Sequence, residues 1–301
     1  MDAVVVASYA KINLTLDVSE KRPDGFHAIE SVMQSVSLRD IITLRVEAEP
    51  GIRVTCDMPW IPVDERNLAY KAAKLILDRC ENPSGISIDI KKTIPVQAGL
   101  GGGSSNAAAV LRGLNRLLNL SLGPDALCEI AARIGSDVPF FIIGGTALVQ
   151  GRGEIVHPLS GIGEFYCLIV KPPFGVSTAW SYNRLDEIRA SEDGRVEPNA
   201  HSERMVKCIE SGDWHCLPGL LYNDLELPAI EQHPKIAEIK DALIDAGAYC
   251  ALMCGSGSAV FGLFESETSA RCADDRLSKF GKVFAAKTLV RDEDGLDLQS
   301  L

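Results

Sequence analysis

A glycine-rich segment is the part of the chain whose residue types point most directly to chemistry. Residues 95–106 read PVQAGLGGGSSN. Glycine adopts positive φ angles at little cost and lets a ligand approach the backbone without meeting a Cβ atom. The amphipathic, alanine-rich stretch that follows predicts a helix, and free amides at a helix N-terminus attract phosphate. We therefore predict a phosphate-binding loop, with Ser104 or Ser105 as the cap of the helix.

Two other interpretations of this segment remain open at this stage. Gly and Ser also make flexible linkers, but a linker rarely runs directly into a strongly amphipathic helix. The segment is also compatible with a structural loop that binds nothing. The usual nucleotide and hydrolase motifs do not fit, because the chain has no GxxxxGK[ST] and no GxSxG sequence.

Transfer of a phosphoryl group also needs a residue that orients or deprotonates the acceptor and a cation that balances charge. Asp137 lies in the sequence GSDVP, between a predicted helix and a predicted strand, and Lys11 lies beside Asn13 on the polar face of the first predicted strand. Taken singly, Asp137 is a typical turn or capping residue, and Lys11 is a typical surface lysine. The sequence does not place the two together.

Charge and composition exclude several classes of function. The chain has 30 Lys and Arg against 41 Asp and Glu, a formal net charge of −11, which argues against sequence-independent nucleic-acid binding. Its apolar runs are shorter than the roughly 20 residues that cross a bilayer, and the opening Met1–Ala3 lacks the basic start of a signal peptide. The nine cysteines form no CxxC pair and predict reduced thiols without a metal site. We expect a cytoplasmic protein without membrane or nucleic-acid partners.

Apolar spacing predicts the elements that position the candidate residues in the first half of the chain. We expect a helix opened by Asp64, one after the glycines through Leu118, and one from Asp125 that ends at Gly135. The predicted strands of this half are 4–18, 41–46, 52–56, 86–90, 141–149 and 165–170.

The second half differs in its residue composition and includes a polar, charged segment at 190–199 that predicts a loop. Helices are predicted near 201–211, 213–221, 234–246 and 267–280, and strands at 251–253, 259–264 and 283–290. Strands and helices mix without strict alternation, which favours an α+β fold over a doubly wound parallel sheet. We predict two domains, residues 1–160 and 161–301.

Three segments taken together resemble the three motifs of the GHMP kinases. They are AKIN at Ala10–Asn13, the glycine-rich segment with its two following alanines, and CGSGS at Cys254–Ser258. They occur in the family's order, and the resemblance spans nearly the whole chain. RPDGFH at Arg22–His27 and GSDVP at Gly135–Pro139 resemble most the members that act on a cytidine diphosphate alcohol.

The resemblance implies a fold, an activity and a set of ligands. The N-terminal domain would be ribosomal-protein-S5-like and bind ATP, the C-terminal domain ferredoxin-like, with the active site in the cleft between them. The enzyme would be a kinase of isoprenoid precursor biosynthesis that moves the γ-phosphate of ATP to the 2-hydroxyl of a cytidine diphosphate alcohol. Mg²⁺ would accompany the nucleotide, with no separate protein metal site. Whether the protein is a monomer or a homodimer stays open.

The family's functional residues carry over to matching positions. Asp137 would take the hydroxyl proton, with Lys11 beside both groups. The residues matching the ATP-phosphate loop are Pro95, Val96, Gln97, Ala98, Gly99, Leu100, Gly101, Gly102, Gly103, Ser104 and Ser105. His27 would read the cytosine edge, and Phe26 and Tyr182 would flank the base. The remaining expected substrate contacts are Asn13, Gly255 and Ser256.

Two positions depart from the family's pattern, and two other functions remain open. Cys254 stands where serine is usual, and Phe26 where tyrosine is common. The chain could instead be a GHMP kinase for a sugar, homoserine or a mevalonate-type acid, or a catalytically silent binding relative. The presence of both Lys11 and Asp137 argues against the silent relative.

Overall fold

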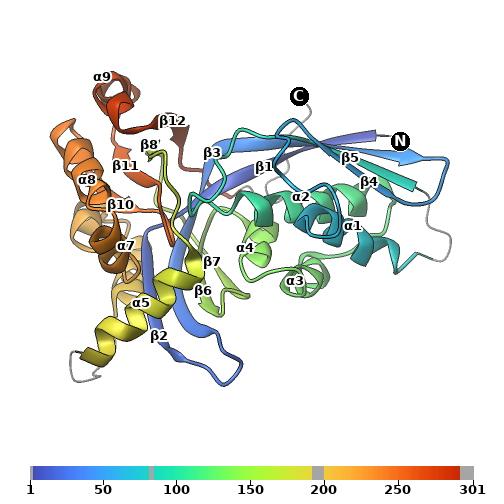
Figure 1. The fold of residues 1–301 in the computed structure, drawn as a ribbon, viewed down its shortest axis with the longest axis horizontal. Helices are drawn as coiled ribbons and strands as arrows, with labels where there is room; N and C mark the ends of the chain where they lie inside the picture. The colour runs from blue at the N-terminus through green and yellow to red at the C-terminus, as the bar shows by residue number, and fades with distance from the viewer. Residues whose placement is uncertain (1–2, 81–84, 192–199, 292–301) are drawn as a thin grey trace.

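The computed structural model describes residues 3–80, 85–191 and 200–291, which build two β-sheets (Figure 1). The larger sheet contains β1 (Ala3–Asn13), β2 (Thr15–Lys21), β3 (His27–Glu47), β4 (Ile52–Cys56), β5 (Gly85–Lys91), β6 (Thr146–Gly151), β7 (Ile155–Leu159) and β9 (Tyr222–Asn223). The smaller sheet has the order β10 (Cys250–Met253), β11 (Val260–Phe264), β8 (Tyr166–Lys171) and β12 (Lys282–Lys287). All its pairs are antiparallel.

Strand β3 organises the larger sheet. It is 21 residues long and pairs with β2 and β6 near its start and with β1 and β5 further on. Residues that point to the core, such as Val32, Ile42 and Leu44, are fully buried. Strand β1 pairs with β3 along its whole length, which fixes its backbone. Its polar residues Lys11 and Asn13 are therefore held in buried positions.

Four helices of the first half pack beside this sheet (Figure 1). They are α1 (Leu68–Leu77), α2 (Gly102–Leu117), α3 (Pro124–Ala132) and α4 (Val138–Ile143). Helix α2 contacts α1, α3, α4, β1 and β3, and its residues from Ala107 to Leu111 are completely buried. The buried middle of this helix fixes the position of its N-terminus and hence of the glycine-rich segment, which stays partly exposed.

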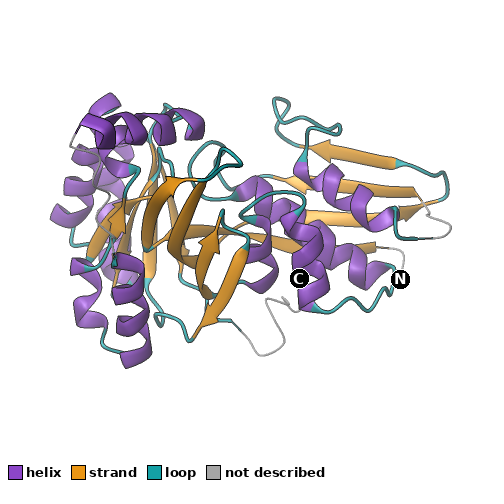
Figure 2. Cartoon of the chain, turned by 90° about the horizontal axis from the view of Figure 1, so that it is seen from below, coloured by secondary structure: helices purple, strands orange, loops and turns teal. Residues whose placement is uncertain are grey.

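Helix α6 (His201–Ser211) and the short helix η1 (Trp214–Gly219) pack into the core that the smaller sheet shares with the larger one. The other helices of the second half gather on the outer side of the smaller sheet (Figure 2). They are α5 (Thr178–Ser191), α7 (Glu226–Gln232), α8 (Lys235–Asp245), α9 (Glu267–Leu277) and η2 (Ser278–Phe280). In β8 the alternation of side chains separates two cores: Leu168 and Val170 face these helices, while Cys167 and Ile169 face the first half. Two α+β units with a common interface confirm the expected fold class.

Several predicted element bounds are wrong. The strand expected at 4–18 is divided at Leu14, and that expected at 141–149 begins only at Thr146, because Phe141–Ile143 belong to α4. Helix α5 was not predicted, since its buried residues are only Ser181 and Leu185 and form no apolar stripe. Helix α7 was missed as well. The expected loop at 190–199 lies outside the described residues from position 192 on.

Two helix ends also differ from expectation. Asp64 accepts hydrogen bonds from the backbone and side chain of Arg66 and so forms a turn, whereas Asn67 caps α1 by accepting from the amide of Ala69 at 2.9 Å. Gly135 was expected as the left-handed residue after α3. The helix ends at Ala132, and Gly135 does not adopt positive φ.

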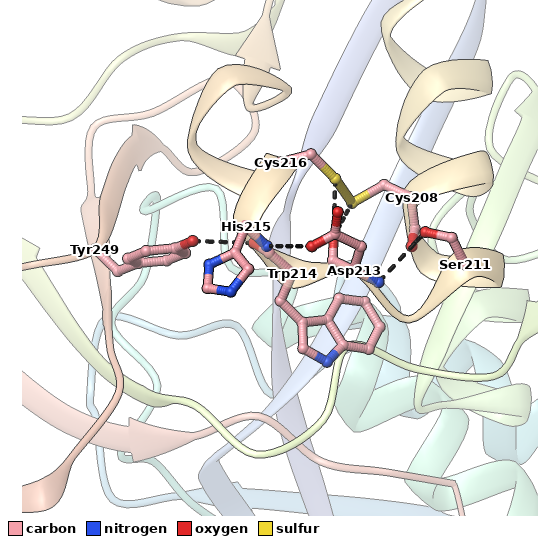
Figure 3. Close-up of a disulfide and its surroundings, with 7 residues drawn as sticks. All are labelled: Cys208, Ser211, Asp213, Trp214, His215, Cys216 and Tyr249. Atoms are coloured by element: carbon pink, nitrogen blue, oxygen red, sulfur yellow. Dashed lines mark hydrogen bonds between the residues drawn. A yellow bond between two sulfur atoms is a disulfide. The ribbon is translucent and has the colours of Figure 1, made fainter.

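The expectation of nine reduced thiols is wrong for two cysteines. Cys208, near the end of α6, and Cys216, in η1, form a disulfide with Cα atoms 6.8 Å apart (Figure 3). The chain reverses between the two helices, which brings the residues within the usual disulfide range. The other seven cysteines are free thiols. None of the described helices combines the length and the apolar character needed to cross a bilayer.

Candidate active site

A cleft of about 810 Å³ lies between the two halves of the chain. Its lining includes Lys11 from β1, Asp137 from the turn before α4, and the backbone of residues 95–104. From the second half it includes residues 175–178, Tyr182 and residues 255–257. The structure therefore brings most of the sequence-predicted site residues to one place. The volume is within the range of small-molecule sites.

The glycine-rich segment forms a turn that opens directly into α2. Gly101 is the N-cap of the helix at φ 70°, and no side chain caps the first turn. Ser104 and Ser105 lie inside the helix, so the expectation that one of them caps it is wrong. The first-turn amides of α2 thus face the cleft without a competing side-chain acceptor, which is the arrangement that attracts phosphate.

Both other motifs touch this turn. The backbone amide of Lys11 donates to the carbonyl of Leu100 at 3.1 Å, which fastens the turn to β1. Gly99 has φ 75°, and a Cβ atom there would lie 1.8 Å from the carbonyl oxygen of Cys254. The turn and the residue 254–258 loop therefore pack backbone against backbone, and only glycine fits between them.

We expect Gly99→Ala to destabilise the protein by about 2 kcal/mol, because a side chain costs about 1–2 kcal/mol at this φ and the contact with Cys254 adds to it. The KM for ATP should rise as the turn moves. Urea unfolding and initial-rate kinetics would measure both. Gly123→Ala is the matched control, since Gly123 has φ −72° and no atom within 4 Å of the added Cβ. Equal stability of the two variants would contradict the packing argument.

A buried carboxylate on β3 holds the glycine-rich turn in place. Asp40 of β3 is completely buried and accepts hydrogen bonds from the amides of Thr93 and Ile94 at 2.7 and 2.9 Å. It also accepts from the side chain of Asn106 in α2 at 2.8 Å and forms an ion pair with Lys92, whose side chain is 3% exposed. One carboxylate thus fixes the segments on both sides of the glycines.

Lys92 lines the cleft and was not found from the sequence. A Cβ on Gly102 would lie 3.2 Å from its Nζ, so the ammonium group sits against the glycine turn. Its signal in the sequence is weak, because Lys91 precedes it and a pair of lysines at the end of a strand is typical of a solvent-exposed edge. Only the structure shows that one of the two is buried.

Lys11 is oriented by a chain of hydrogen bonds. Its Nζ donates to Oδ1 of Asn13 at 2.6 Å, Nδ2 of Asn13 donates to Ser31 at 2.9 Å, and Ser31 donates to the carbonyl of Thr15 at 2.5 Å. Lys11 is 4% exposed and Asn13 is 1% exposed, so neither is a surface residue. A buried ammonium that keeps free donors toward a cleft is suited to an anionic ligand.

Asp137 precedes α4 but does not cap it. Its backbone is helical, at φ −79° and ψ −13°, and its side chain makes no capping bond. Within the described part of the chain its carboxylate has no hydrogen-bond or ion-pair partner, and it faces the cleft. The alternative role as a capping residue therefore has no support in the geometry.

The residue 254–258 loop closes the cleft from the second half. Asn223 of β9 donates to the carbonyls of Met253 and Gly255 at 3.0 and 2.8 Å and holds the loop in place. The hydroxyl groups of Ser256 and Thr178 share a hydrogen bond, with 2.8 Å between Oγ and Oγ1. Burial raises the pKa of the Cys254 thiol to about 12. The cysteine found in place of the usual serine is therefore a neutral packing residue.

One aromatic side chain of α5 lines the cleft, and a histidine packs against it from outside the lining. Tyr182 lines the cleft, and burial, followed by the charges of Asp137 and Asp224, raises the pKa of its hydroxyl. His27 stacks on it, with ring centroids 5.1 Å apart. Phe26 is 53% exposed, and its ring lies under the guanidinium of Arg152 at 5.2 Å. This aromatic end of the cleft, with the residues around it, offers flat apolar surfaces and one imidazole.

Three of the predicted site residues do not line the cleft itself. His27 stacks on Tyr182 from outside the lining, and Phe26 packs against Arg152. Ser105 is buried against Ser8 with an Oγ–Oγ distance of 2.8 Å. The side chain of Ser105 therefore packs the helix onto β1. The other predicted site residues all line the cleft.

The donors of the cleft fit a magnesium ion that arrives with a nucleotide. Asp137 is the single carboxylate among the described residues that line it, and no cluster of three metal-ligating side chains occurs in the described part of the chain. Mg²⁺ commonly binds through one or two carboxylates together with substrate phosphates and water. The phosphates of the nucleotide, water and the hydroxyl of Ser104 would hold the ion, because Asp137 is expected to take the hydroxyl proton.

Comparison with known proteins adds independent findings. The family profile described as "GHMP kinases N terminal domain" matches residues 67–145, and that described as "GHMP kinases C terminal" matches residues 205–283. The 4-diphosphocytidyl-2-C-methyl-D-erythritol kinase of Bacillus subtilis (strain 168) is 44% identical over 288 residues, which cover 96% of this chain and 97% of that protein.

Solved structures give the same result for the fold. A crystal structure of 4-(cytidine 5'-diphospho)-2C-methyl-D-erythritol kinase superposes with a TM-score of 0.79 at 32% identity, and the match covers 95% of this chain and 99% of that one. Homoserine kinase from Cytophaga hutchinsonii superposes with a TM-score of 0.77 at 21% identity, covering 96% and 95%. The similarity to homoserine kinase supports the fold alone.

Proposed function

This chain belongs to the GHMP kinase family, and we propose that it transfers the γ-phosphoryl group of ATP to the 2-hydroxyl of 4-diphosphocytidyl-2-C-methyl-D-erythritol, giving ADP and the 2-phosphate. This reaction is a step in the biosynthesis of isoprenoid precursors. The observation that carries the proposal is the convergence of Lys11, Asp137 and the glycine turn on one cleft. The nearly full-length similarity to kinases of this name supports the choice of substrate.

The glycine turn would bind the triphosphate. The amides at the start of α2 point into the cleft, and the ammonium of Lys92 lies beside Gly102. These groups are held in place by Asp40 before any ligand arrives, so their orientation costs nothing during the reaction. Magnesium would neutralise part of the phosphate charge.

Lys11 and Asp137 would act on the acceptor alcohol. The hydroxyl oxygen attacks the γ-phosphorus, the bond from that phosphorus to the β–γ bridging oxygen breaks, and ADP leaves with the electron pair. The hydroxyl proton passes to the carboxylate of Asp137, which has no other partner within the described residues. Lys11, oriented by Asn13, balances the negative charge that develops between them.

The aromatic end of the cleft would hold the cytosine base. Phe26 and Tyr182 offer flat faces for stacking, worth about 1–3 kcal/mol per base. His27 lies at the same end and would read the base edge. Gly255 packs against Lys11, since a Cβ atom on Gly255 would lie 3.2 Å from Nζ of Lys11. Gly255 and Ser256 line the cleft there and would contact the rest of the substrate. We also propose that residues 1–160 form the ATP-binding domain and that the enzyme works in the cytoplasm.

Release of ADP tests the proposal directly. The purified protein should release ADP with the cytidyl alcohol at a rate far above that with homoserine, mevalonate or a hexose. Phosphorus NMR should identify a new phosphomonoester at the 2-position. Turnover of one of the other alcohols and not of the cytidyl compound would assign the chain to a different member of the family. Binding without turnover of any alcohol would make it a silent relative.

A further inference from the structure

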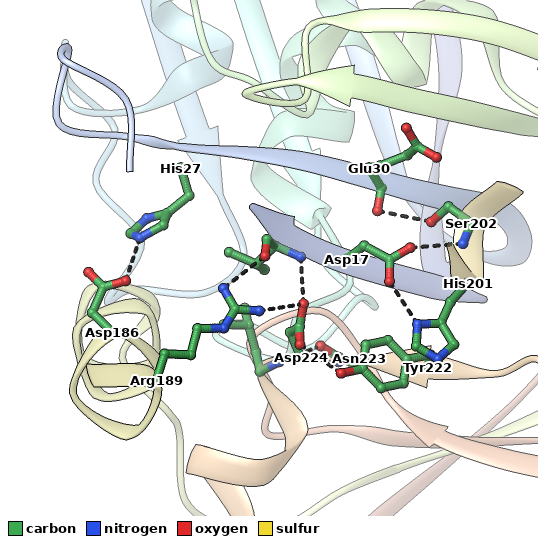
Figure 4. Close-up of polar contacts among 12 residues, drawn as sticks. Asp17, His27, Glu30, Asp186, Arg189, His201, Ser202, Tyr222, Asn223 and Asp224 are labelled. Atoms are coloured by element: carbon green, nitrogen blue, oxygen red, sulfur yellow. Dashed lines mark hydrogen bonds and ion pairs between the residues drawn. The ribbon is translucent and has the colours of Figure 1, made fainter. Parts of the chain in front are cut away.

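His27 is held by a carboxylate that lies outside the cleft. Its Nε2 lies 2.7 Å from Oδ1 of Asp186, which belongs to α5 (Figure 4). The His27 side chain is 5% exposed and that of Asp186 is 38% exposed. Oδ2, the second carboxylate oxygen of Asp186, lies 3.9 Å from Nζ of Lys21. Only Oδ1 therefore accepts a hydrogen bond from the imidazole. Asp186 is not among the residues that line the cleft.

The surrounding contacts fix both partners. Arg189, one turn further along α5, donates to the carbonyl of Val18 at 2.8 Å and pairs with Asp224 at 3.0 Å (Figure 4). Asp224 in turn accepts from the amide of Val18 at 2.6 Å. Helix α5 is thereby fastened to β2, the strand that precedes the turn before His27, the first residue of β3. The stacking of Tyr182 on His27 fixes the plane of the imidazole.

This geometry determines which ring nitrogen of His27 carries the proton. A carboxylate only accepts, so Nε2 has to donate, and in a neutral imidazole the other nitrogen is then an acceptor. The bond to Asp186 is the one hydrogen bond of the His27 ring among the described residues, so Nδ1 is left without a protein partner there. His27 therefore presents one acceptor, beside a ring that lines the cleft.

We infer that Asp186 is a positioning residue that makes the site specific for cytosine over uracil by fixing the tautomer of His27. The 4-amino group of cytosine is a donor and satisfies Nδ1. Uracil has a carbonyl oxygen at that position, so two acceptors would face each other and stay unpaired. The inference rests on the proposed function, because it takes the aromatic end of the cleft as the place of the base.

Direct binding of two nucleotides tests this inference. CDP and UDP would be titrated calorimetrically into the protein with a non-hydrolysable ATP analogue present to fill the ATP site. The wild-type protein should prefer CDP. Asp186→Ala should reduce the ratio of the two dissociation constants about tenfold, as expected for one unpaired buried group. The KM for ATP should not change.

Two further variants separate positioning from a general structural effect. Glu187→Ala removes the neighbouring carboxylate of α5, which pairs with Arg184 on the surface, and should leave the ratio unchanged. In a His27→Ala background, Asp186→Ala should have no additional effect on the ratio, because the carboxylate acts only through the imidazole. A ratio depends on neither the active fraction nor the amount of folded protein.

The outcomes are distinct from those of the kinase assay. An unchanged ratio in Asp186→Ala, or an added loss in the His27→Ala background, would overturn the inference while leaving the proposed function intact. Preference for CDP that depends on Asp186, in a protein without turnover of the cytidyl alcohol, would uphold the inference and refute the proposed function. A wild-type protein that binds CDP and UDP equally well would overturn the inference.

Discussion

Asp137→Ala is expected to lower kcat by about two to four orders of magnitude, the usual contribution of a general base. The carboxylate faces the cleft and has no competing partner within the described residues, so its removal leaves the acceptor hydroxyl without a proton acceptor. The affinity for ATP should be nearly unchanged, because the amides of α2 and Lys92 stay in place. Single-turnover phosphoryl transfer and calorimetric titration of a non-hydrolysable ATP analogue would measure the two quantities.

Asp125→Asn provides the matched control. Asp125 is an exposed carboxylate in the first turn of α3, the helix that precedes Asp137 in the chain, and it does not line the cleft. Its neutralisation should leave kcat close to that of the wild-type protein. A value of kcat near normal in Asp137→Ala would remove this residue from the mechanism.

Asp40→Ala is expected to give the largest loss of stability, about 3–5 kcal/mol, because it leaves the ammonium of Lys92 buried without its counter-charge. The amides of Thr93 and Ile94 lose their acceptor as well. Since these residues lead into the glycine turn, the affinity for ATP should fall in the same variant. Urea unfolding and calorimetric titration of the ATP analogue would show both effects.

Two substitutions calibrate that result. Asp40→Asn keeps an acceptor for the two amides but removes the charge, so its loss of stability should be smaller than that of Asp40→Ala. Asp64→Ala breaks the exposed pair with Arg66 and should change stability very little, as is usual for surface ion pairs. Equal effects of Asp40→Ala and Asp64→Ala would show that the buried pair does not anchor the turn.

The local motifs of the active site could be predicted from the sequence because each of them is short and has a distinctive composition. Four glycines before an alanine-rich helix predict a phosphate turn, and the structure shows that turn at the edge of a cleft. The alternation of β1 predicted that Lys11 and Asn13 share a face, and they are hydrogen-bonded to each other. The roles assigned to these residues stay predictions until the variants are measured.

The supporting contacts could not be predicted, because they join residues far apart in the chain. Asp40 lies 53 residues from Thr93, and His27 lies 159 residues from Asp186. Neither Asp40 nor Asp186 belongs to a recognisable motif. From the sequence alone, each is expected to be a surface residue, as most aspartates are. Helix α5, which carries Asp186, has no apolar stripe and gave no periodic signal. Long-range pairing of this kind is decided by tertiary packing.

The two halves of the chain also share one interior. The inner face of the smaller sheet, with Ile169 and Phe261, belongs to the same core as Ile12 and Val32 of the larger sheet. Strand β9 comes from the second half but pairs with β2, and residues 287–289 hydrogen-bond to β3. Rotating the halves as rigid bodies about a hinge would expose this interior to water. Such a rotation would therefore cost the burial of this shared apolar surface, which holds the two walls of the cleft at a fixed distance from each other.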